Sequence, residues 1–246
     1  MVSKNQKKLI RSLKQKKYRK QHGLFVVEGI KVIREFLNTH YVLKNLFVLN
    51  AEVHLFHEIE EKKRQVVSEL ELSQLSFLTT PQKAVAVFEI PVAKTEVKHE
   101  GLQVVLDDVK DPGNLGTIIR LCDWFGVERL ICSNETVDCY NPKVVQATMG
   151  SLTRISVIYT SISGYIKEAD VPVIGAFMDG ENVYQATLPK KGLLIMGNEA
   201  NGISATIEKE ITQKIAIPRF GVIQQTESLN VATATAILLS EFRRGV

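Results

Sequence analysis

The chain has 246 residues, of which 45% are hydrophobic and 24% are charged, with a net charge of +4. This composition excludes a disordered protein, and the length suffices for two modest cores, so we expect two domains. No apolar run is long enough for a membrane span, and no hydrophobic signal region follows the basic N-terminus. Cys122, Cys132 and Cys139 form no CxxC pair, which fits buried thiols in a reducing compartment. We therefore predict a cytoplasmic protein without a membrane partner.

Positive charge is concentrated at the N-terminus. Residues 1–20 hold nine Lys or Arg and no acid, whereas the remainder has twenty-two basic and twenty-seven acidic residues. Leu9, Ile10 and Leu13 recur at helical spacing, which predicts a basic helix with a narrow apolar stripe. Such charge density suits a nucleic-acid backbone; a solvated face and an anionic membrane surface are the alternatives. The residues expected to contact nucleic acid are Lys7, Lys8, Arg11, Lys14, Lys17 and Arg19.

Short strands and helices alternate between residues 24 and 90. The expected strands are LFVVEG, NLFVLN, QVVS and AVAVFEI, and the expected helices are IKVIREFLNTH, HLFHEIEEKKRQ and ELSQLSFLTT. This alternation predicts a small α/β sandwich. His54 and His57 lie three apart, as two metal ligands on a helix can, but no third ligand is near in sequence. We interpret them as surface residues and expect no metal.

A linker is expected at PVAKTEVKHEG, which has a proline, mixed charges and no sustained apolar pattern. It divides the chain into predicted domains 1–95 and 96–246. The second domain opens with the strand LQVVLDD and continues with the helix NLGTIIRLCDWFGV, the strand ERLICS, the helix NPKVVQATMGSL and the strand VPVIGAF. This order predicts a mostly parallel sheet with helices on both faces.

Three turns of this domain are candidates for a ligand site. LLIMGNEANGIS and KIAIPRFGVIQQTESLNVATATAILLSEFRR each combine an apolar strand, a Gly-containing turn and a helix start. In DDVKDPGNLGTIIR a helix is expected to begin at about Asn114, which places Asn114, Gly116 and Arg120 near the carboxyl edge of the sheet. The alternative for Arg120 is a surface residue or an ion pair, for example with Asp108 or Asp111. The turn lacks GxGxxG and GxxxxGK[ST], which disfavours dinucleotide and P-loop sites.

Together, NLGTIIR, LLIMGNEANGIS and IAIPRFG with ESLNVATATAILLSEFRR resemble the three motifs of the SpoU (TrmH-like) branch of the SPOUT RNA methyltransferase superfamily. The N-terminal part resembles the substrate-binding domain, similar to a ribosomal protein fold, that many members carry. The resemblance implies a C-terminal α/β domain with a deep trefoil knot, which ordinary topology rules do not anticipate. It also implies S-adenosylmethionine as cofactor, a homodimer with the site near its interface, and methyl transfer to a ribose 2′-OH of transfer or ribosomal RNA.

The resemblance also implies roles for individual residues. Arg120 is expected to orient and polarise the ribose hydroxyl, because a guanidinium is too basic to serve as a general base. Asn114 is expected to fix the ribose or a partner loop, Glu199 to organise the pocket, and Ser228 and Asn230 to tie substrate and knot together. The positions expected at the cofactor are Met196, Gly197, Asn198, Gly202, Ile217 and Leu229.

Two features depart from the family pattern. VIQQTE separates Gly221 from Ser228, an apparent insertion in the knot loop, and Lys83 stands where a glycine is common. Two other functions stay open at this point: a catalytically silent RNA-binding assembly factor of the same fold, and a dinucleotide-binding oxidoreductase. The presence of all five predicted catalytic residues argues against the first, and the missing fingerprint argues against the second.

Overall fold

The computed structural model describes residues 1–92, 100–221, 223 and 228–244. The chain divides into two compact units, one of Met1–Ala93 with Asp138–Thr153 and the other of Lys94–Val137 with Arg154–Val246. The segment Asp138–Thr153 therefore groups with the first unit, although the sequence placed it in the C-terminal half. The predicted boundary between residues 95 and 96 lies outside the described residues and stays a prediction.

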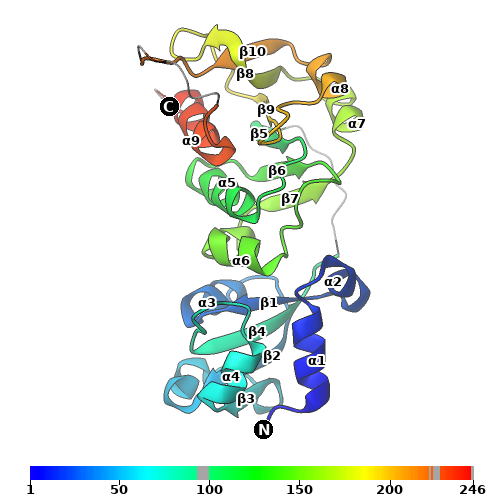
Figure 1. Ribbon diagram of the computed structural model, residues 1–246, viewed down its shortest axis with the longest axis vertical. Helices are drawn as coiled ribbons and strands as arrows, with labels where there is room; N and C mark the ends of the chain where they lie inside the picture. Colours follow the sequence, from blue (N-terminus) through cyan, green and yellow to red (C-terminus); the bar gives the residue numbers. More distant parts are fainter. Residues whose placement is uncertain (93–99, 222, 224–227, 245–246) are drawn as a thin grey trace. The chain divides into compact units, whose positions relative to one another are not determined.

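The first unit contains a four-stranded sheet in the order β1-β4-β2-β3 (Figure 1). β4 is antiparallel to β1 and β2, and β3 is parallel to β2. The strands are β1 (Leu24–Glu28), β2 (Leu43–Leu49), β3 (Arg64–Val67) and β4 (Ala84–Glu89). The helices are α1 (Lys4–Ser12), α2 (Lys16–His22), α3 (Ile30–Leu37), α4 (Glu69–Leu75) and α6 (Pro142–Thr148), with 3-10 turns η1 (Asn50–Phe56), η2 (Glu61–Lys63) and η3 (Ser151–Thr153).

One sequence prediction for this unit needs correction, and the departure from the family pattern at Lys83 is accommodated by the backbone. The polar helix expected at HLFHEIEEKKRQ is replaced by the 3-10 turns η1 and η2, because Arg64 Nη1 donates to the Phe56 carbonyl at 2.7 Å and the chain turns there into β3. Lys83 has no positive φ, so its backbone does not require glycine; its ammonium pairs with Glu52. His54 and His57 are both exposed, as expected for surface residues.

The basic N-terminus is part of the folded unit rather than a free arm. α1 begins with a capping box, in which Ser3 Oγ accepts from the Gln6 amide and the Gln6 side chain accepts from the Ser3 amide. Ile10 and Leu13 are buried in a core cluster that also contains Leu72 and Leu75 of α4. The predicted single helix is broken into α1 and α2 at residues 13–15. Apolar burial therefore fixes where the cations of α1 lie on the surface.

Arg19 was expected to bind RNA, and this prediction is wrong. Its side chain is 2% exposed, and its Nε and Nη2 donate to Asp138 Oδ2 at 2.9 and 2.6 Å. Its Nη1 donates to the carbonyls of Leu13 and Lys14. A buried guanidinium with these four bonds cannot reach a phosphate, and it joins the turn after α1 to the segment that carries α6. Of the remaining cations on the list, Lys7 is half-buried, and Lys8, Arg11, Lys14 and Lys17 are exposed.

The other face of this sheet is covered by α3 and α6. An aromatic cluster fills the space, with ring centroids of Phe25 and Tyr140 separated by 4.7 Å and those of Phe36 and Tyr41 by 4.8 Å. Such tilted aromatic contacts stabilise a core beyond their buried area by about 0.5–1.5 kcal/mol per pair. Tyr140 lies in the segment that joins this unit from the second half of the chain. Helices on both sheet faces confirm the predicted α/β sandwich.

The second unit contains a six-stranded sheet in the order β10-β8-β9-β5-β6-β7, with every neighbouring pair parallel. The strands are β5 (Leu102–Leu106), β6 (Arg129–Cys132), β7 (Ser156–Tyr159), β8 (Val173–Asn182), β9 (Gly192–Met196) and β10 (Gln213–Ala216). The helices are α5 (Pro112–Trp124), α7 (Ile162–Lys167), α8 (Ala205–Glu208) and α9 (Val231–Phe242). The predicted α/β fold with a parallel sheet is confirmed; β7 and α7 were not anticipated.

The helices of the second unit cover both faces of its sheet. α5 and α9 pack together on one face, and α7 and α8 lie on the other (Figure 1). β5 and β9 are buried along their whole length. Their register pairs Leu106 with Met196, the last residue of each strand. The loops that follow these two strands therefore leave the sheet side by side, at its carboxyl edge.

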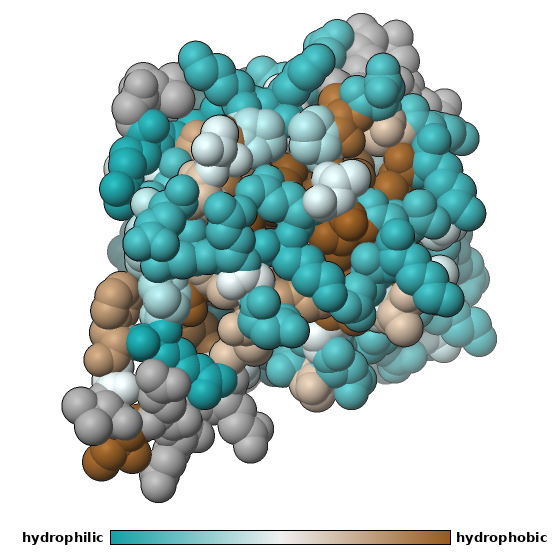
Figure 2. All heavy atoms as spheres, turned by 90° about the horizontal axis from the view of Figure 1, so that it is seen from above, coloured by the Kyte–Doolittle hydropathy of each residue, from teal (hydrophilic) through white to brown (hydrophobic). Residues whose placement is uncertain are grey.

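Cysteine burial and surface polarity agree with the composition. Cys122, Cys132 and Cys139 are buried free thiols, which confirms their interpretation as core residues. The face in Figure 2 is largely hydrophilic, with apolar side chains showing between the polar ones. The most exposed large apolar side chains of the second unit are Trp124, Phe220 and Ile223, at 85, 81 and 78%. In the described part of the chain, no helix combines the length and apolarity needed to cross a bilayer.

Candidate active site

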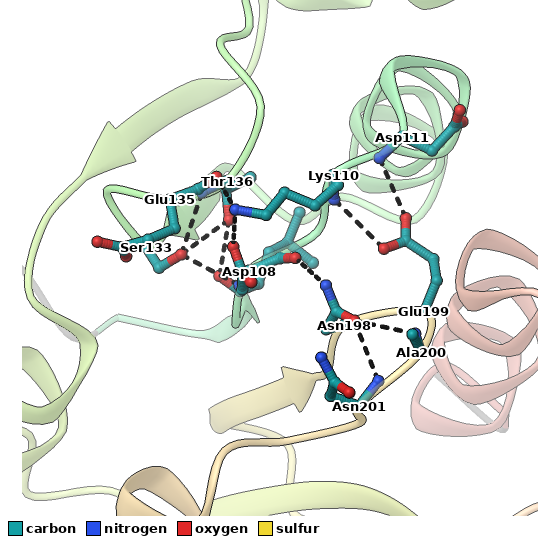
Figure 3. A network of polar contacts seen from close by, with 11 residues as sticks. Asp108, Lys110, Asp111, Ser133, Glu135, Thr136, Asn198, Glu199, Ala200 and Asn201 are labelled. Carbon is teal, nitrogen blue, oxygen red and sulfur yellow. Dashed lines mark hydrogen bonds and ion pairs between the residues drawn. The ribbon is translucent and has the colours of Figure 1, made fainter.

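The site is built where the loops after β5 and β9 meet (Figure 3). The Asp107 amide donates to the Met196 carbonyl at 2.9 Å, and the Asp107 carboxylate accepts from the Ser204 amide at 2.8 Å. Asn198 Nδ2 donates to the Asp108 carbonyl at 2.7 Å. Each loop thus supplies polar groups to the other, because the last residues of two neighbouring parallel strands lie in register.

The loop after β9 is closed by its own hydrogen bonds. Asn198 Oδ1 accepts from the amides of Ala200 and Asn201, and the main chains of Asn198 and Gly202 exchange two bonds of 2.9 Å. Gly202 has a φ of +66°, which favours glycine. A Cβ at Gly197 would lie 2.2 Å from the Gly202 carbonyl carbon, far inside van der Waals contact. The two glycines allow the main chain to fold back on itself within this loop.

The start of α5 differs from the prediction by two residues. The helix begins at Pro112, and Asp111 caps it, with Oδ1 accepting from the Asn114 amide at 2.8 Å. The Asp108 carboxylate forms an ion pair with Lys110. Neither acid pairs with Arg120, so the ion pair considered for Arg120 is wrong, whereas the alternative of a surface residue agrees with its exposed position.

Asn114 joins three separate segments of the chain. Its Nδ2 donates to Glu199 Oε1 at 2.9 Å, and its Oδ1 accepts from Asn230 Nδ2 at 2.9 Å. Asn230 is also the N-cap of α9, since its Oδ1 accepts from the amides of Ala232 and Thr233. The structure therefore brings together three predicted site residues that lie 85 and 116 positions apart in sequence.

Glu199 is held as a carboxylate by donors from the β5 loop. Its carboxylate oxygens accept from the main-chain amides of Lys110 and Asp111, both at 3.3 Å (Figure 3). Glu199 Oε1 also accepts from Asn114 Nδ2. Desolvation alone would raise the pKa of Glu199, but these hydrogen bonds outweigh it and lower the pKa below its ordinary value. A charged Glu199 at neutral pH cannot donate a proton, so its position suits organising the loops.

Arg120 and Ser228 do not join this network. The exposed positions of α5 are Gly113, Thr117, Arg120 and Trp124, whose spacing of four, three and four marks one solvent-facing stripe. Arg120 lies on this stripe, and among the described residues no side chain or carbonyl is hydrogen-bonded to it. Ser228 is exposed just before the α9 cap. One chain thus presents the arginine on a face that is open to a second molecule.

The positions expected at the cofactor are distributed over two loops and one strand end. Met196 is buried at the end of β9, Gly197, Asn198 and Gly202 belong to the closed loop, and Ile217 is half-buried after β10. Leu229 exposes 48% of its surface beside Asn230. The apparent insertion lies outside the described residues except for Ile223. Within the described ranges, no three His, Cys, Asp or Glu residues gather closely enough to hold a metal.

The sequence did not reveal the contributions of Asp107, Asp108 and Lys110, whose carboxylate, carbonyl and amide, respectively, tie the β5 loop to the loop after β9. The signal available was the pair of acids directly after an apolar strand, in LQVVLDD. Acids at that place can accept from main-chain amides of an adjacent loop. Which loop is adjacent depends on the strand order, and the sequence does not give that order.

Family models match nearly the whole chain. Residues 101–240 match the SpoU rRNA Methylase family, and residues 4–86 match the MRM3-like substrate binding domain. The first match covers the six-stranded sheet and the candidate active site. The second covers α1 to the first half of β4, including most of the basic N-terminal segment.

Relatives and solved structures match over almost the full length. The chain is 32% identical to the 23S rRNA (guanosine(2553)-2′-O)-methyltransferase RlmP of Bacillus subtilis, over 98% of this chain and 97% of that protein. A Porphyromonas gingivalis structure assigned to the TrmH family of RNA methyltransferases has a TM-score of 0.89 at 40% identity, over 99% of both chains. An AdoMet-bound rRNA methyltransferase from Sinorhizobium meliloti has a TM-score of 0.87 at 31% identity, over 99% of this chain and 97% of that one.

Proposed function

The chain belongs to the SpoU rRNA methylase family, and we propose on this basis that it transfers a methyl group from S-adenosylmethionine to a ribose 2′-hydroxyl of ribosomal RNA. The observation that carries this function is the bonded set of Asn114, Glu199 and Asn230, one residue from each family motif. The choice of ribosomal over transfer RNA rests on the Bacillus subtilis relative, whose name states a 23S rRNA substrate.

The residues at the carboxyl edge fit S-adenosylmethionine. The cofactor has an adenine ring with flat aromatic faces, several hydrogen-bonding groups and a positive sulfonium. Leu229 and Ile217 offer apolar surface, and the closed loop from Gly197 to Gly202 offers main-chain groups at close approach. When bound, the cofactor supplies an electrophilic methyl group. The Glu199 carboxylate adds negative charge to a pocket that receives a cation.

Arg120 is the residue proposed to act on the ribose. In the transfer, the hydroxyl oxygen forms a bond to the methyl carbon while the carbon–sulfur bond breaks, and the hydroxyl proton leaves to solvent or to an RNA phosphate. A guanidinium can hold the phosphate and the hydroxyl in one geometry through its fixed fork of donors. Positioning of this kind is a large part of catalysis when two molecules must meet. Ser228 and Asn230 are proposed to bind the same nucleotide from the start of α9.

A homodimer is proposed because the arginine is exposed to solvent and makes no hydrogen bond to the bonded set of its own chain. Arg120 shares its exposed stripe with Trp124, whose side chain is 85% exposed. A second copy that covers this stripe would bury the Trp124 ring and bring Arg120 to a site that is shared between chains. The trefoil knot, the likeness of the first unit to a ribosomal protein fold and the cytoplasmic location stay proposals that the family membership supports.

The function is tested by methyl transfer from labelled S-adenosylmethionine to ribosomal RNA, followed by mapping of 2′-O-methyl groups. We expect Arg120→Ala to lower turnover by roughly a hundredfold while cofactor affinity stays nearly unchanged, because only transition-state positioning is lost. Arg154→Ala is the matched control. Arg154 is ion-paired with Asp123 at the amino end of β7, so it lies at the sheet edge opposite the site.

The outcomes separate the candidate functions. The enzyme is supported if the protein methylates ribosomal RNA, if Arg120→Ala lowers turnover by roughly a hundredfold and if Arg154→Ala preserves it. Cofactor binding without methyl transfer to any RNA supports the silent assembly factor. Near-normal turnover in Arg120→Ala contradicts the role given to that residue.

A further inference from the structure

The first unit has an open groove beside α1 that the proposed methyl transfer does not use. It has a volume of about 400 Å³ and is lined by Arg11, Lys14 and the four residues 76–79. This volume falls within the range of about 300–1,000 Å³ that is typical of small-ligand sites. Arg11 and Lys14 are exposed, and Phe77 and Leu78 are half-buried. The groove thus combines two cations with an apolar wall.

The wall of the groove is held in place by a buried carboxyl group. Glu28, at the end of β1, is 5% exposed and accepts from Ser76 Oγ at 2.5 Å and from the Phe77 amide at 2.7 Å. Ser76 Oγ in turn accepts from the Leu78 amide at 3.1 Å. Phe77 also packs against the core cluster that contains Ile10 and Leu13. These bonds end α4 at Leu75 and fix the turn that presents Phe77 and Leu78.

The cations of the groove are also oriented by the fold. Arg11 Nε donates to the Gln74 carbonyl at 3.0 Å, which leaves both terminal nitrogens as donors, since no other described residue is hydrogen-bonded to them. Lys14 lies in the short turn between α1 and α2, whose position is set by burial of Leu13. Among the described residues, no acidic side chain lines the groove. An anionic ligand therefore meets two preplaced cations.

We propose that this groove binds one nucleotide of a single-stranded stretch of the RNA substrate. Arg11 and Lys14 hold its phosphate, and the base lies against Phe77 and Leu78. Base contact with an aromatic side chain requires an unstacked base, which a duplex does not offer. The proposal rests on the proposed function, because it assigns a recognition site to the same RNA. The proposal also divides the cations of the basic segment into two groups. Arg11 and Lys14 form a binding site, and the other cations only add to the positive electrostatic field.

A pair of variants with equal charge loss tests this division in the full-length protein. Arg11→Gln/Lys14→Gln removes two positive charges from the groove, and Lys16→Gln/Lys20→Gln removes two exposed charges from α2. Both are titrated with a short oligouridylate and with an RNA duplex of the same length, at several salt concentrations. We expect the groove pair to weaken oligouridylate binding by tenfold or more and to reduce its salt slope by about 0.7, the value for the loss of one phosphate contact on a single strand. The α2 pair should have a clearly smaller effect.

The apolar wall is tested by Phe77→Leu, which keeps apolar bulk and removes the ring. Oligouridylate affinity should fall by about fivefold or more, in line with base stacking of about 1–3 kcal/mol, with duplex affinity unchanged. Circular dichroism and thermal unfolding verify that the variant folds. If both charge pairs lose equal affinity, if duplex binds as well as oligouridylate, or if wild type does not bind oligouridylate, the groove is not the site. Methyl transfer by the wild type is measured separately, so failure of the groove and failure of the proposed enzyme are distinguishable.

Discussion

Asn114→Asp is the sharpest test of the bonded set, because it keeps the size of the side chain and reverses one interaction. The amide nitrogen that donates to Glu199 at 2.9 Å becomes a carboxylate oxygen, whereas the bond from Asn230 can persist. The loss of a hydrogen bond to a charged group costs about 1.5 kcal/mol at the low end, which suits an exposed acceptor. Repulsion between the two carboxylates at this distance adds about 1.4 kcal/mol in water. The total of about 3 kcal/mol predicts a loss of turnover of about a hundredfold.

The assay is methyl transfer measured between pH 5 and 8, with urea unfolding as the second readout. In Asn114→Asp the adjacent carboxylates raise the pKa of one another, so protonation at low pH should partly restore activity relative to wild type. In the double variant Asn114→Asp/Glu199→Gln, the new amide can donate to the aspartate. We expect this variant to have a higher turnover than the product of the two single fold-changes predicts, and a higher unfolding free energy than the sum of the two single changes predicts. Strict additivity in both readouts would refute the coupling between these two residues.

Three further predictions concern other parts of the molecule. Gly197→Ala should abolish cofactor binding, because the new Cβ would collide with the main chain at Gly202 and Ile203. The control is Gly164→Ala in α7, whose Cβ would meet Ser161 Oγ at 3.7 Å and which should be neutral or slightly stabilising. Equal cofactor affinity in both variants would contradict the loop geometry. Arg19→Ala should destabilise the first unit by about 3 kcal/mol in urea unfolding, because it leaves Asp138 without its partner, and a value below about 1 kcal/mol would show that the ion pair is dispensable. Burial raises the pKa of Glu28, despite hydrogen bonds from Ser76 and Phe77 that lower it. Wild type should therefore lose stability relative to Glu28→Gln as the pH rises from 4 to 7. If the difference in unfolding free energy between the two proteins does not change with pH, this assignment is contradicted.

The elements of the fold were largely predictable, but their partners were not. Apolar runs such as Leu102–Leu106 and Gly192–Met196 give fully buried strands, and the helix predicted to begin at about Asn114 begins two residues earlier, at Pro112. Such features depend on a few neighbouring residues. The strand order and the grouping of Asp138–Thr153 with the first unit depend on packing between distant segments, for which a single sequence has no local signal.

Arg19 illustrates the same limit at the level of one side chain. Within the sequence it is one of nine cations in a basic segment, and charge density alone predicts exposure. Its burial depends on Asp138, which lies 119 positions later. In the same way, the motifs identified Asn114, Glu199 and Asn230 as site residues, but only the three-dimensional structure shows that they bind one another. Their catalytic roles remain predictions.

The contacts of Asn114 also determine when the site can form during folding. Its partners lie 85 and 116 positions away, so the site requires the closure of two long loops and the assembly of β5, β9 and α9. Non-local contacts of this kind form late and slowly, since chain entropy must be lost before they contribute. Local elements such as the capped α5 can form much earlier. A partly folded chain with native-like helices would therefore lack the bonded set, and the appearance of activity during refolding should coincide with the last cooperative step rather than with the gain of helix.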